Sequence, residues 1–326
     1  MLLINSRVTP SNQLVSIVPD FSPGISVLMT TYNAMPYLPA SVESILGQTY
    51  ENFELIIIDD GSTDDSRDYL DSLTDVRVKT FHEKNRGTAG ASNFGLQHCR
   101  RKYIARMDAD DISMPTRLEK QYAFMEANEH VSLVGSQIQV VGEKGLGMVI
   151  AIPTEHKAIT DALLALNHGM NHGSCMYRNE LIKQLDGYWK KYHTFDDWDM
   201  FLRMSEVGEL ANLPEVLYQY RTLPSSLVGS QFYKMRKYQS YANECLRMRR
   251  AGSPEPILED FLRKYDERPW YAKMLEVVDN YALHQYRRAV SEICVNQKLQ
   301  GYSRLAFAGL CSPSRALQRI RRELTK

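Results

Sequence analysis

The side chains best suited to chemistry in this sequence are carboxylates at the ends of apolar runs. Asp108, Asp110 and Asp111 follow the apolar segment 102–107. Carboxylates at positions i and i+2 after a strand can share one divalent cation, and hard oxygen ligands suit Mg²⁺ or Mn²⁺. Such a metal bridges a carboxylate to substrate phosphates and stabilises a diphosphate leaving group. The alternative is that this acidic turn only caps the following helix.

Two more polar clusters follow apolar runs earlier in the chain. Asp59 and Asp60 end the run 53–59, and the turn Thr30-Thr31-Tyr32-Asn33 follows the β-rich run 25–31. A carboxylate such as Asp60 can accept a hydrogen bond from a base N–H or a ribose hydroxyl, whereas the Gly, Ser and Asp residues after it favour a turn and a cap. The Thr30–Asn33 turn has no glycine-rich phosphate loop, which argues against a nicotinamide dehydrogenase and a sugar nucleotidyltransferase.

The elements that must position these clusters alternate between strand and helix. This order predicts an α/β fold with a mainly parallel sheet and helices on both faces. Ligands bind beyond the carboxyl ends of such strands, so the three clusters should converge on one cleft. Strands are expected at 25–31, 53–59, 76–81 and 102–107, and helices at 36–48, 66–73, 88–99 and 115–127. Further expected elements are strands at 132–141, 148–152 and 174–178, and helices at 154–166 and 196–207.

Composition excludes several classes of protein. The 326 residues balance 39 Lys and Arg against 39 Asp and Glu, so a dedicated nucleic-acid binder is not expected. Five scattered cysteines with no CxxC spacing argue against disulfides and zinc, and they fit a reducing cytoplasm. No apolar run approaches the ~18–20 residues that span a bilayer, and the N-terminus lacks the pattern of a signal peptide. A cytoplasmic location is therefore expected.

The chain is expected to divide into a poorly ordered lead-in (1–22), a catalytic domain (23–230) and a helical C-terminal region (231–326). Residues 287–326 contain nine Lys and Arg against two Asp and Glu. Leu317, Ile320 and Leu324 recur at helical spacing among these basic residues, which indicates an amphipathic helix. Such a helix could give peripheral contact with the inner face of the cell membrane, or it could pack on the catalytic domain.

The sequence resembles glycosyltransferase family 2, a group of inverting enzymes with the GT-A fold, over residues 25 to about 222. The matching blocks are ISVLMTTYNAMPYLPASVESILGQTYENFELIIIDDGSTDDS, NRGTAGASNFGL, YIARMDADDISMPTRLEKQ, HGSCMYR and DDWDMFLRM. The QxxRW block of processive polysaccharide synthases is missing. The resemblance thus implies a non-processive, bacterial type of enzyme that adds single sugars.

The resemblance also implies roles for individual residues. Thr30 and Tyr32 would line the nucleotide pocket, in the same block as Asn33. Asp60 would bind the base, usually uracil, and Asp197 would be the catalytic base. The remaining implied contacts are Arg86 and Asn93 near the nucleotide and sugar, and Asp108 and Asp110 in the DxD motif, with Asp110 as the more direct ligand of Mn²⁺ or Mg²⁺.

Asp197 is also a reasonable base on chemical grounds. Inversion needs one displacement, so a base opposite the leaving diphosphate must remove the acceptor hydroxyl's proton. The alternative is that Asp196, Asp197 and Asp199 only complement a helix dipole. The sequence departs from the family in reading Asp196-Asp197 where Glu-Asp is usual.

A second departure lies on the metal side of the expected site. Leu223 stands where many relatives carry a histidine. His172 and His193 are possible substitutes, and each is also a possible acceptor-site or surface histidine. Asp196 and His172 are therefore taken as candidate acceptor contacts.

These observations predict a metal-assisted enzyme that moves a sugar from a nucleotide diphosphate, with UDP favoured, to an acceptor hydroxyl. The acceptor is expected to be a cell-surface or lipid-linked glycan. A catalytically silent scaffold is the alternative, and intact Asp60, Asp108, Asp110 and Asp197 count against it.

Overall fold

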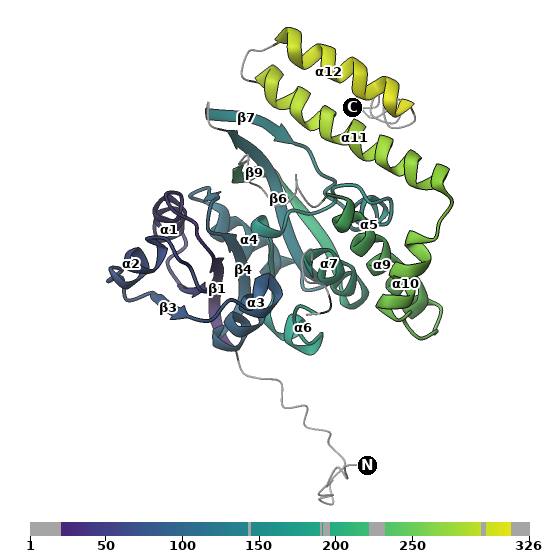
Figure 1. Cartoon of the computed structure of the whole chain (residues 1–326). Coiled ribbons are helices and arrows are strands. Elements are labelled where there is room, and N and C mark those ends of the chain that lie inside the picture. The colour runs from purple at the N-terminus through teal and green to yellow at the C-terminus, as the bar shows by residue number, and fades with distance from the viewer. Residues whose placement is uncertain are drawn as a thin grey trace, which may run out of the picture.

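The computed structural model describes residues 21–142, 145–189, 191, 196–221, 232–294 and 298–313. In these residues one nine-stranded sheet runs through the molecule in the order β3-β2-β1-β4-β8-β6-β9-β5, with β7 paired to β6 (Figure 1). The strands are β1 (Ser22–Thr31), β2 (Phe53–Asp59), β3 (Val78–His82), β4 (Arg101–Asp108), β5 (Ile112–Ser113), β6 (Val131–Gly142), β7 (Gly145–Ile150), β8 (Met176–Arg178) and β9 (Glu209–Arg221).

The sheet is parallel in its first half and mixed in its second. Strands β1, β2, β3 and β4 pair in parallel, as the alternation of elements predicts. Strand β8 pairs antiparallel with β4 and β6, and β7 and β5 pair antiparallel with β6 and β9. Strand β9 lies parallel to β6. The predicted α/β architecture is therefore confirmed, with a mixed sheet.

Helices cover both faces of the sheet, so its central strands are mostly buried and mainly apolar. In β2, Leu55 and Ile57 enter one core and Ile56 and Ile58 enter the other, and all four are fully buried. The helices of this α/β body are α1 (Leu38–Leu46), α2 (Ser66–Asp71), α3 (Gly87–His98), α4 (Arg117–Ala127), α5 (His156–Leu164), the 3₁₀ turn η1 (His172–Ser174), α6 (Asn179–Gln184) and α7 (Asp196–Val207).

In the part of the chain that the structure describes, four helices follow the sheet. They are α9 (Phe232–Arg250), α10 (Leu258–Asp266), α11 (Trp270–Cys294) and α12 (Lys298–Cys311). Helix α9 packs beside α7 and places Tyr238, Tyr241 and Leu246 in the same core as β2 and α3. Helices α11 and α12 form a hairpin at the upper edge of the molecule (Figure 1). The C-terminal region is thus helical over its described residues.

The domain boundaries at residues 22 and 230 stay predictions. Residues 1–20 of the expected lead-in, and the predicted amphipathic helix with Leu317, Ile320 and Leu324, lie outside the described residues. None of the helices that the structure describes is both long and apolar enough to cross a membrane.

Candidate active site

The carboxyl ends of β1, β2 and β4 lie together at one edge of the sheet. In the parallel register, Thr31 pairs with Asp59 and Thr30 pairs with Asp108. The strand register thus brings the three polar clusters side by side, as the sequence predicts for strands of this type. They form the first part of the candidate site.

Asn33 joins the loop after β1 to the loop after β2. Its φ of 51° lies in the left-handed region, which Asn tolerates better than most residues. Its side-chain oxygen accepts a hydrogen bond from the Thr63 amide at 2.7 Å, and its own amide donates to the Ser62 hydroxyl at 3.0 Å. The neighbouring Tyr32 is 52% exposed, so its ring is open to a planar base.

The two acids at the end of β2 have different tasks. Asp59 is buried, accepts a hydrogen bond from the Ser62 amide and pairs with His82 at 2.9 Å, so it holds the turn together. Asp60 is also buried and accepts a hydrogen bond from the Arg86 amide at 2.7 Å. Burial raises the pKa of Asp60 above its ordinary value. Asp60 therefore links the end of β2 to the start of α3.

The two donor-site candidates near α3 face different partners. The guanidinium of Arg86 is half exposed, pairs with Glu83 and lies over the Phe94 ring at 5.5 Å. The Asn93 amide donates to the Tyr188 carbonyl at 2.6 Å and accepts from the Tyr188 amide at 2.8 Å. These two bonds make Asn93 an anchor for the segment that leads to α7.

Arg106 is a buried cation under the site that the sequence reading did not single out. Its guanidinium donates to the Thr30 hydroxyl at 2.7 Å and lies 3.2 Å from the Asp108 carboxylate. The side chain of Asp108 is 33% exposed, so this carboxylate reaches the surface while the Arg106 guanidinium beneath it stays buried. Arg106 lies two residues before Asp108 on the same strand and thus on the same face. That spacing is the signal that could have revealed it.

The Asp110-Asp111 turn is fixed by β9, which crosses beside it. The Arg221 guanidinium donates to the Asp110 carbonyl at 2.7 Å, and the Arg221 amide donates to the Asp111 carboxylate at 2.7 Å. The hydroxyl of the buried Tyr218, on the same strand, accepts a hydrogen bond from the Asp108 backbone amide at 3.2 Å. Sequence reasoning missed Tyr218 and Arg221 because it assigned no strand to β9.

The carboxylates of this turn fit a divalent cation. Burial and the charge of Asp108 raise the pKa of Asp110 to about 6. A bound cation would relieve that repulsion, and diphosphate oxygens and water would complete its coordination. Gly173 packs directly against the turn, because a Cβ there would lie 2.7 Å from Asp108 Oδ2. No group of three His, Cys, Asp or Glu side chains suited to a metal occurs in the described part of the chain.

Helix α7 begins with three acids that differ in environment. Asp199 is fully buried and pairs with Arg203 at 2.7 Å, so its role is structural. Asp196 is buried and accepts a hydrogen bond from the Thr88 hydroxyl, and burial raises its pKa to about 6. Burial and the charges of Asp196 and Asp108 raise the pKa of Asp197 to about 7. Asp197 is thus the acid of the three with a pKa suited to a base near neutral pH.

His172 lies in the 3₁₀ turn η1 within a buried network of phenols. Its Nε2 atom is 2.7 Å from the Tyr188 hydroxyl, which is 3.0 Å from the Tyr177 hydroxyl. Burial and the charge of Arg106 hold the pKa of His172 well below its ordinary value, so the ring is neutral. Leu223 and His193 lie outside the described residues.

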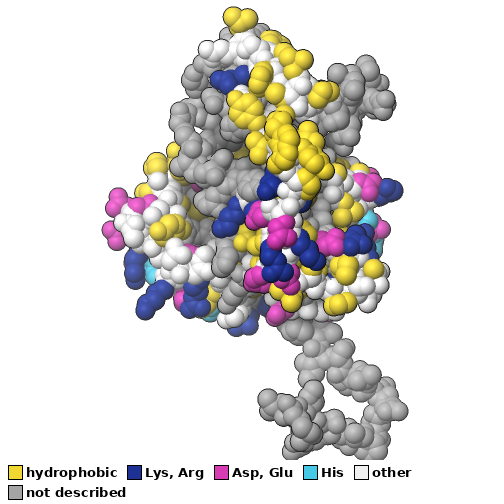
Figure 2. Space-filling model, turned by 45° about the vertical axis from the view of Figure 1, so that its right-hand side comes forward, with side chains coloured by type: hydrophobic (Ala, Val, Ile, Leu, Met, Phe, Trp, Pro, Cys, Tyr) yellow, Lys and Arg dark blue, Asp and Glu magenta, His cyan; other side chains and the backbone are white. Residues whose placement is uncertain are grey.

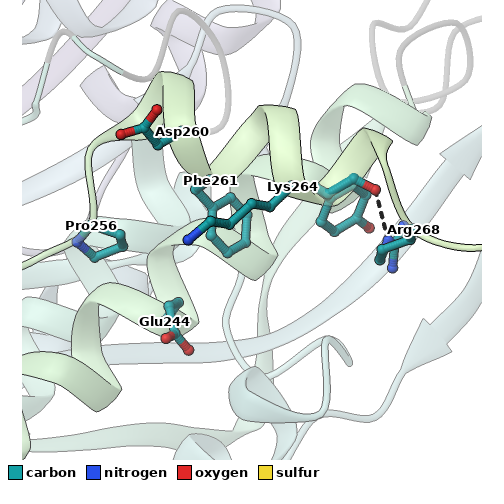
Figure 3. Close-up of a pocket in the computed structure, with 7 residues that line it drawn as sticks. Glu244, Pro256, Asp260, Phe261, Lys264 and Arg268 are labelled. Carbon is teal, nitrogen blue, oxygen red and sulfur yellow. Dashed lines mark hydrogen bonds between the residues drawn. The ribbon is translucent and has the colours of Figure 1, made fainter.

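A hollow of about 340 Å³ lies between α9 and α10, away from these residues. Figure 3 shows Lys264 extending across the Phe261 ring, with Glu244 and Asp260 on either side. None of the residues predicted for the site lines this hollow. It is therefore a separate feature of the C-terminal helices.

The sequence model of glycosyl transferase family 2 matches residues 26–186. A relative from Bacillus subtilis, described as putative glycosyltransferase EpsE, is 38% identical over 61% of this chain and 73% of its own length. This chain belongs to glycosyltransferase family 2. Membership places it among transferase enzymes, and the resemblance drawn from the five sequence blocks is confirmed at the level of the family.

Other relatives and solved structures agree with this placement. The Escherichia coli O-antigen biosynthesis glycosyltransferase WbnJ is 34% identical over 60% of this chain and 79% of its own length. An uncharacterized glycosyltransferase of Haemophilus influenzae is 36% identical, and the match spans 65% of that relative, just under two thirds.

The structural matches are more distant in sequence. The S. aureus TarS 1-349 structure in complex with UDP-GlcNAc matches with a TM-score of 0.52 and 18% identity, over 69% of this chain and 71% of that one. The mannosyltransferase PcManGT of Pyrobaculum calidifontis, in complex with GDP-Man and Mn²⁺, matches with a TM-score of 0.52 and 17% identity, over 94% and 81%. These likenesses show the GT-A fold.

Proposed function

We propose that this chain is an inverting, metal-assisted glycosyltransferase that moves one sugar from a UDP-sugar to an acceptor hydroxyl. The acceptor is a cell-surface or lipid-linked glycan. The observation that carries the proposal is the placement of Asp197 in the first turn of α7, where burial and the charges of Asp196 and Asp108 raise the pKa of this carboxyl to about 7. A base and a diphosphate-binding acid that influence each other electrostatically are the two parts that a single displacement requires.

The chemistry follows from these two groups. The Asp197 carboxylate takes the proton of the acceptor hydroxyl as that oxygen attacks the anomeric carbon of the donor. The new carbon–oxygen bond forms as the bond to the nucleoside diphosphate breaks, and the diphosphate leaves with the electron pair. Attack opposite the leaving group inverts the anomeric centre.

A divalent cation at this site would stabilise the negative charge that develops on the diphosphate. Asp110 and Asp108 are the residues that would hold it. Arg106 contacts the Asp108 carboxylate, and Arg221 donates to the backbone carbonyl of Asp110. The two arginines thus keep the acidic turn in place. The protein thus supplies a fixed acidic turn and leaves the remaining ligand positions to the donor.

The donor pocket is built around Asp60 and the Thr30–Asn33 turn. The Tyr32 ring would stack on the base, and Asp60 would accept a hydrogen bond from the base N–H. Arg86 would reach the nucleotide or the sugar, while Asn93 would position the Tyr188 segment beside it. The UDP-GlcNAc complex among the structural neighbours supports a uridine donor, and the GDP-Man complex supplies the competing guanosine donor.

The acceptor side is formed by the start of α7 and the neighbouring turn η1. Asp196 and the neutral His172 would hydrogen-bond acceptor hydroxyls next to Asp197. A bacterial relative named for O-antigen biosynthesis supports a surface polysaccharide as the acceptor class.

Thermal stability with a panel of nucleotide sugars, each measured with and without Mn²⁺, tests the proposal. A donor at 100 times its dissociation constant should stabilise the protein by about 2.7 kcal/mol. UDP-sugars should raise Tm more with the metal than without it, and GDP- and dTDP-sugars should raise it less. The absence of any Mn²⁺-dependent shift would contradict donor binding. Retention of the anomeric configuration in the product, read by NMR, would contradict inversion.

A further inference from the structure

Helix α11 carries an apolar stripe on the surface of the molecule. Trp270, Met274, Val277 and Tyr281 recur at i, i+4, i+7 and i+11, so they share one side of the helix. Their side chains are 73%, 54%, 55% and 50% exposed. Large apolar side chains gathered on one exposed face mark a contact surface rather than scattered surface residues.

The stripe continues onto the second helix of the hairpin. The Tyr281 ring lies 6.1 Å from the Phe307 ring of α12, edge to face. Leu299, Tyr302 and Leu310 on α12 are also exposed. Figure 2 shows hydrophobic side chains gathered over the upper part of the molecule, with acidic and basic side chains interspersed below them. We refer to the exposed apolar residues of α11 and α12 as the hairpin face.

The carboxylates of α11 have partners away from this stripe. Glu276 accepts hydrogen bonds from the Tyr265 hydroxyl and the Arg268 guanidinium. Asp279 accepts a hydrogen bond from the Ser312 hydroxyl at 2.7 Å. Neither of these two acids falls on the line from Trp270 to Tyr281, so neither places a negative charge on the stripe.

The charges of the chain are distributed unevenly along its sequence. Residues 270–326 contain ten Lys and Arg against four Asp and Glu, in a chain whose totals are 39 and 39. The preceding 269 residues therefore carry the opposite excess. A positive C-terminal region with exposed Trp, Tyr and aliphatic side chains has the composition of an interfacial membrane-binding element.

We propose that the hairpin face docks on an anionic lipid surface and lies in its interface. Trp270, Tyr281 and Tyr302 can place their rings among the headgroups, because indole and phenol are apolar at one end and polar at the other. The basic excess adds attraction to anionic lipids. A second copy of the chain is the less favoured occupant, because two such regions would bring like charge together. The inference is independent of which sugar the enzyme transfers.

Sedimentation of the full chain with vesicles tests this proposal. The wild type should bind vesicles of phosphatidylcholine with one quarter phosphatidylglycerol, bind pure phosphatidylcholine weakly, and lose binding as salt rises. The double variant Trp270→Ser/Met274→Ser should bind the mixed vesicles at least about tenfold more weakly, since each side chain loses its apolar burial. The matched control is Val76→Ser/Val207→Ser, which changes two exposed apolar residues outside the hairpin face and should bind as the wild type does.

Light scattering and Tm complete the design. A Tm equal to that of the wild type shows that a variant folds. If Trp270→Ser/Met274→Ser does not fold, a second pair, Tyr302→Ser/Leu310→Ser, repeats the test on α12. Failure of the wild type to bind the mixed vesicles would overturn the proposal, as would equal binding by wild type and both face variants. A wild-type dimer that becomes a monomer on the same substitutions would assign the face to a second copy instead and would also overturn it.

Discussion

At the scale of single residues, the site depends on aspartates that share one side chain but differ in their surroundings and therefore in their roles. Asp199 pairs with Arg203 and Asp59 pairs with His82, so both of these acids stabilise the local structure. The pKa of Asp197 is raised to about 7, above the value of about 6 for Asp196, because burial and two neighbouring negative charges disfavour its ionised form. One residue type thus serves structure at two positions and, in the proposed function, catalysis at a third.

Replacing Asp197 by Asn should abolish most transfer while leaving donor binding intact. The amide cannot accept the acceptor's proton, and losing a general base typically lowers the rate by about 10²–10⁴-fold. Turnover and donor affinity should be measured together, with Asp161→Asn as a control because that acid lies on α5 and is 61% exposed. A loss of kcat smaller than tenfold would reassign the base to another acid.

The same carboxyl predicts the pH dependence of the enzyme. Its pKa is raised to about 7, so at lower pH it holds a proton and cannot accept another. The value of kcat/KM should therefore fall as pH drops below about 7, by about tenfold per unit once the limb is reached. A profile that stays flat from pH 5.5 to 8 in the wild type would contradict the assignment.

Ionisation of Asp197 should also affect folding stability in a defined direction. A carboxyl whose pKa is higher in the folded state binds its proton more tightly there than in the unfolded chain. Its contribution to stability is therefore favourable at low pH and is lost as pH rises from about 4 toward 7. The Asp197→Asn variant should lack this component, which denaturant titrations of both proteins at several pH values would reveal.

Replacing Asp110 by Asn should weaken metal-dependent donor binding. The substitution removes one of the two charges that make the turn attractive to a hard cation, and a neutral amide is the weaker ligand. Calorimetry of UDP binding with Mn²⁺ should show a loss on the order of tenfold or more. UDP binding without metal should change little, and equal losses in both conditions would point to a folding defect instead.

At the scale of elements, strand β9 and turn η1 close the site from the side opposite β1 and β2. Strand β9 carries Tyr218 and Arg221 to the acidic turn, and η1 places Gly173 against Tyr218. The two contacts of β9 connect residues more than a hundred positions apart, and Gly173 is also remote in sequence from Tyr218, so all of them depend on the sheet rather than on any local pattern.

Gly173 should tolerate no side chain. A Cβ at this position would lie 2.1 Å from the Tyr218 hydroxyl and 2.7 Å from Asp108 Oδ2, so Gly173→Ala must displace one of them. We expect a stability loss of about 1–3 kcal/mol and a larger proportional loss of metal-dependent UDP binding. The control is Gly47→Ala at the end of α1, where the new Cβ would lie 3.3 Å from a local carbonyl. Equal effects of the two substitutions on UDP binding would contradict the packing argument.

The strands and helices that could be predicted from the sequence are those with strong local periodicity. The runs at 53–59 and 196–207 match β2 and α7 at both ends, because an apolar run and an acidic helix start are local signals. Strand β9 was missed because Pro214 interrupts its pattern, and its register against β6 shifts at that region. The acids of the site were therefore predictable, while Arg106, Tyr218 and Arg221, which hold them through tertiary contacts, were not.

At the scale of the whole molecule, the C-terminal helices are of two kinds. Helix α9 belongs to the core beneath α7, where Trp198 donates to the Asn243 side chain at 3.2 Å. Helices α11 and α12 pack mainly on each other, with fewer contacts to α9 and β7. The predicted helical region after residue 230 thus joins a part that supports Asp197 to a part that projects from the body.

Two shortened chains would separate these parts. A chain ending at residue 230 removes Tyr238, Tyr241 and Leu246 from the core, and burial of one such Leu is worth about 1.5–3 kcal/mol. Several losses of that size are comparable with the roughly 5–15 kcal/mol that stabilise a domain, so this chain should not fold cooperatively.

A chain ending at residue 269 keeps α9 and α10 and removes only the hairpin. It should fold with a lower Tm, because it loses the bonds of Glu276 to Arg268 and Tyr265. UDP binding with Mn²⁺ should persist in it, since none of the site residues lies beyond α7 and β9 in the described chain. Circular dichroism melting and UDP titration of both chains show which helices the fold and the site require. If the chain ending at 230 folds and binds UDP, α9 is dispensable and the predicted boundary at residue 230 is a true domain boundary. If the chain ending at 269 fails to fold, the hairpin is part of the core fold.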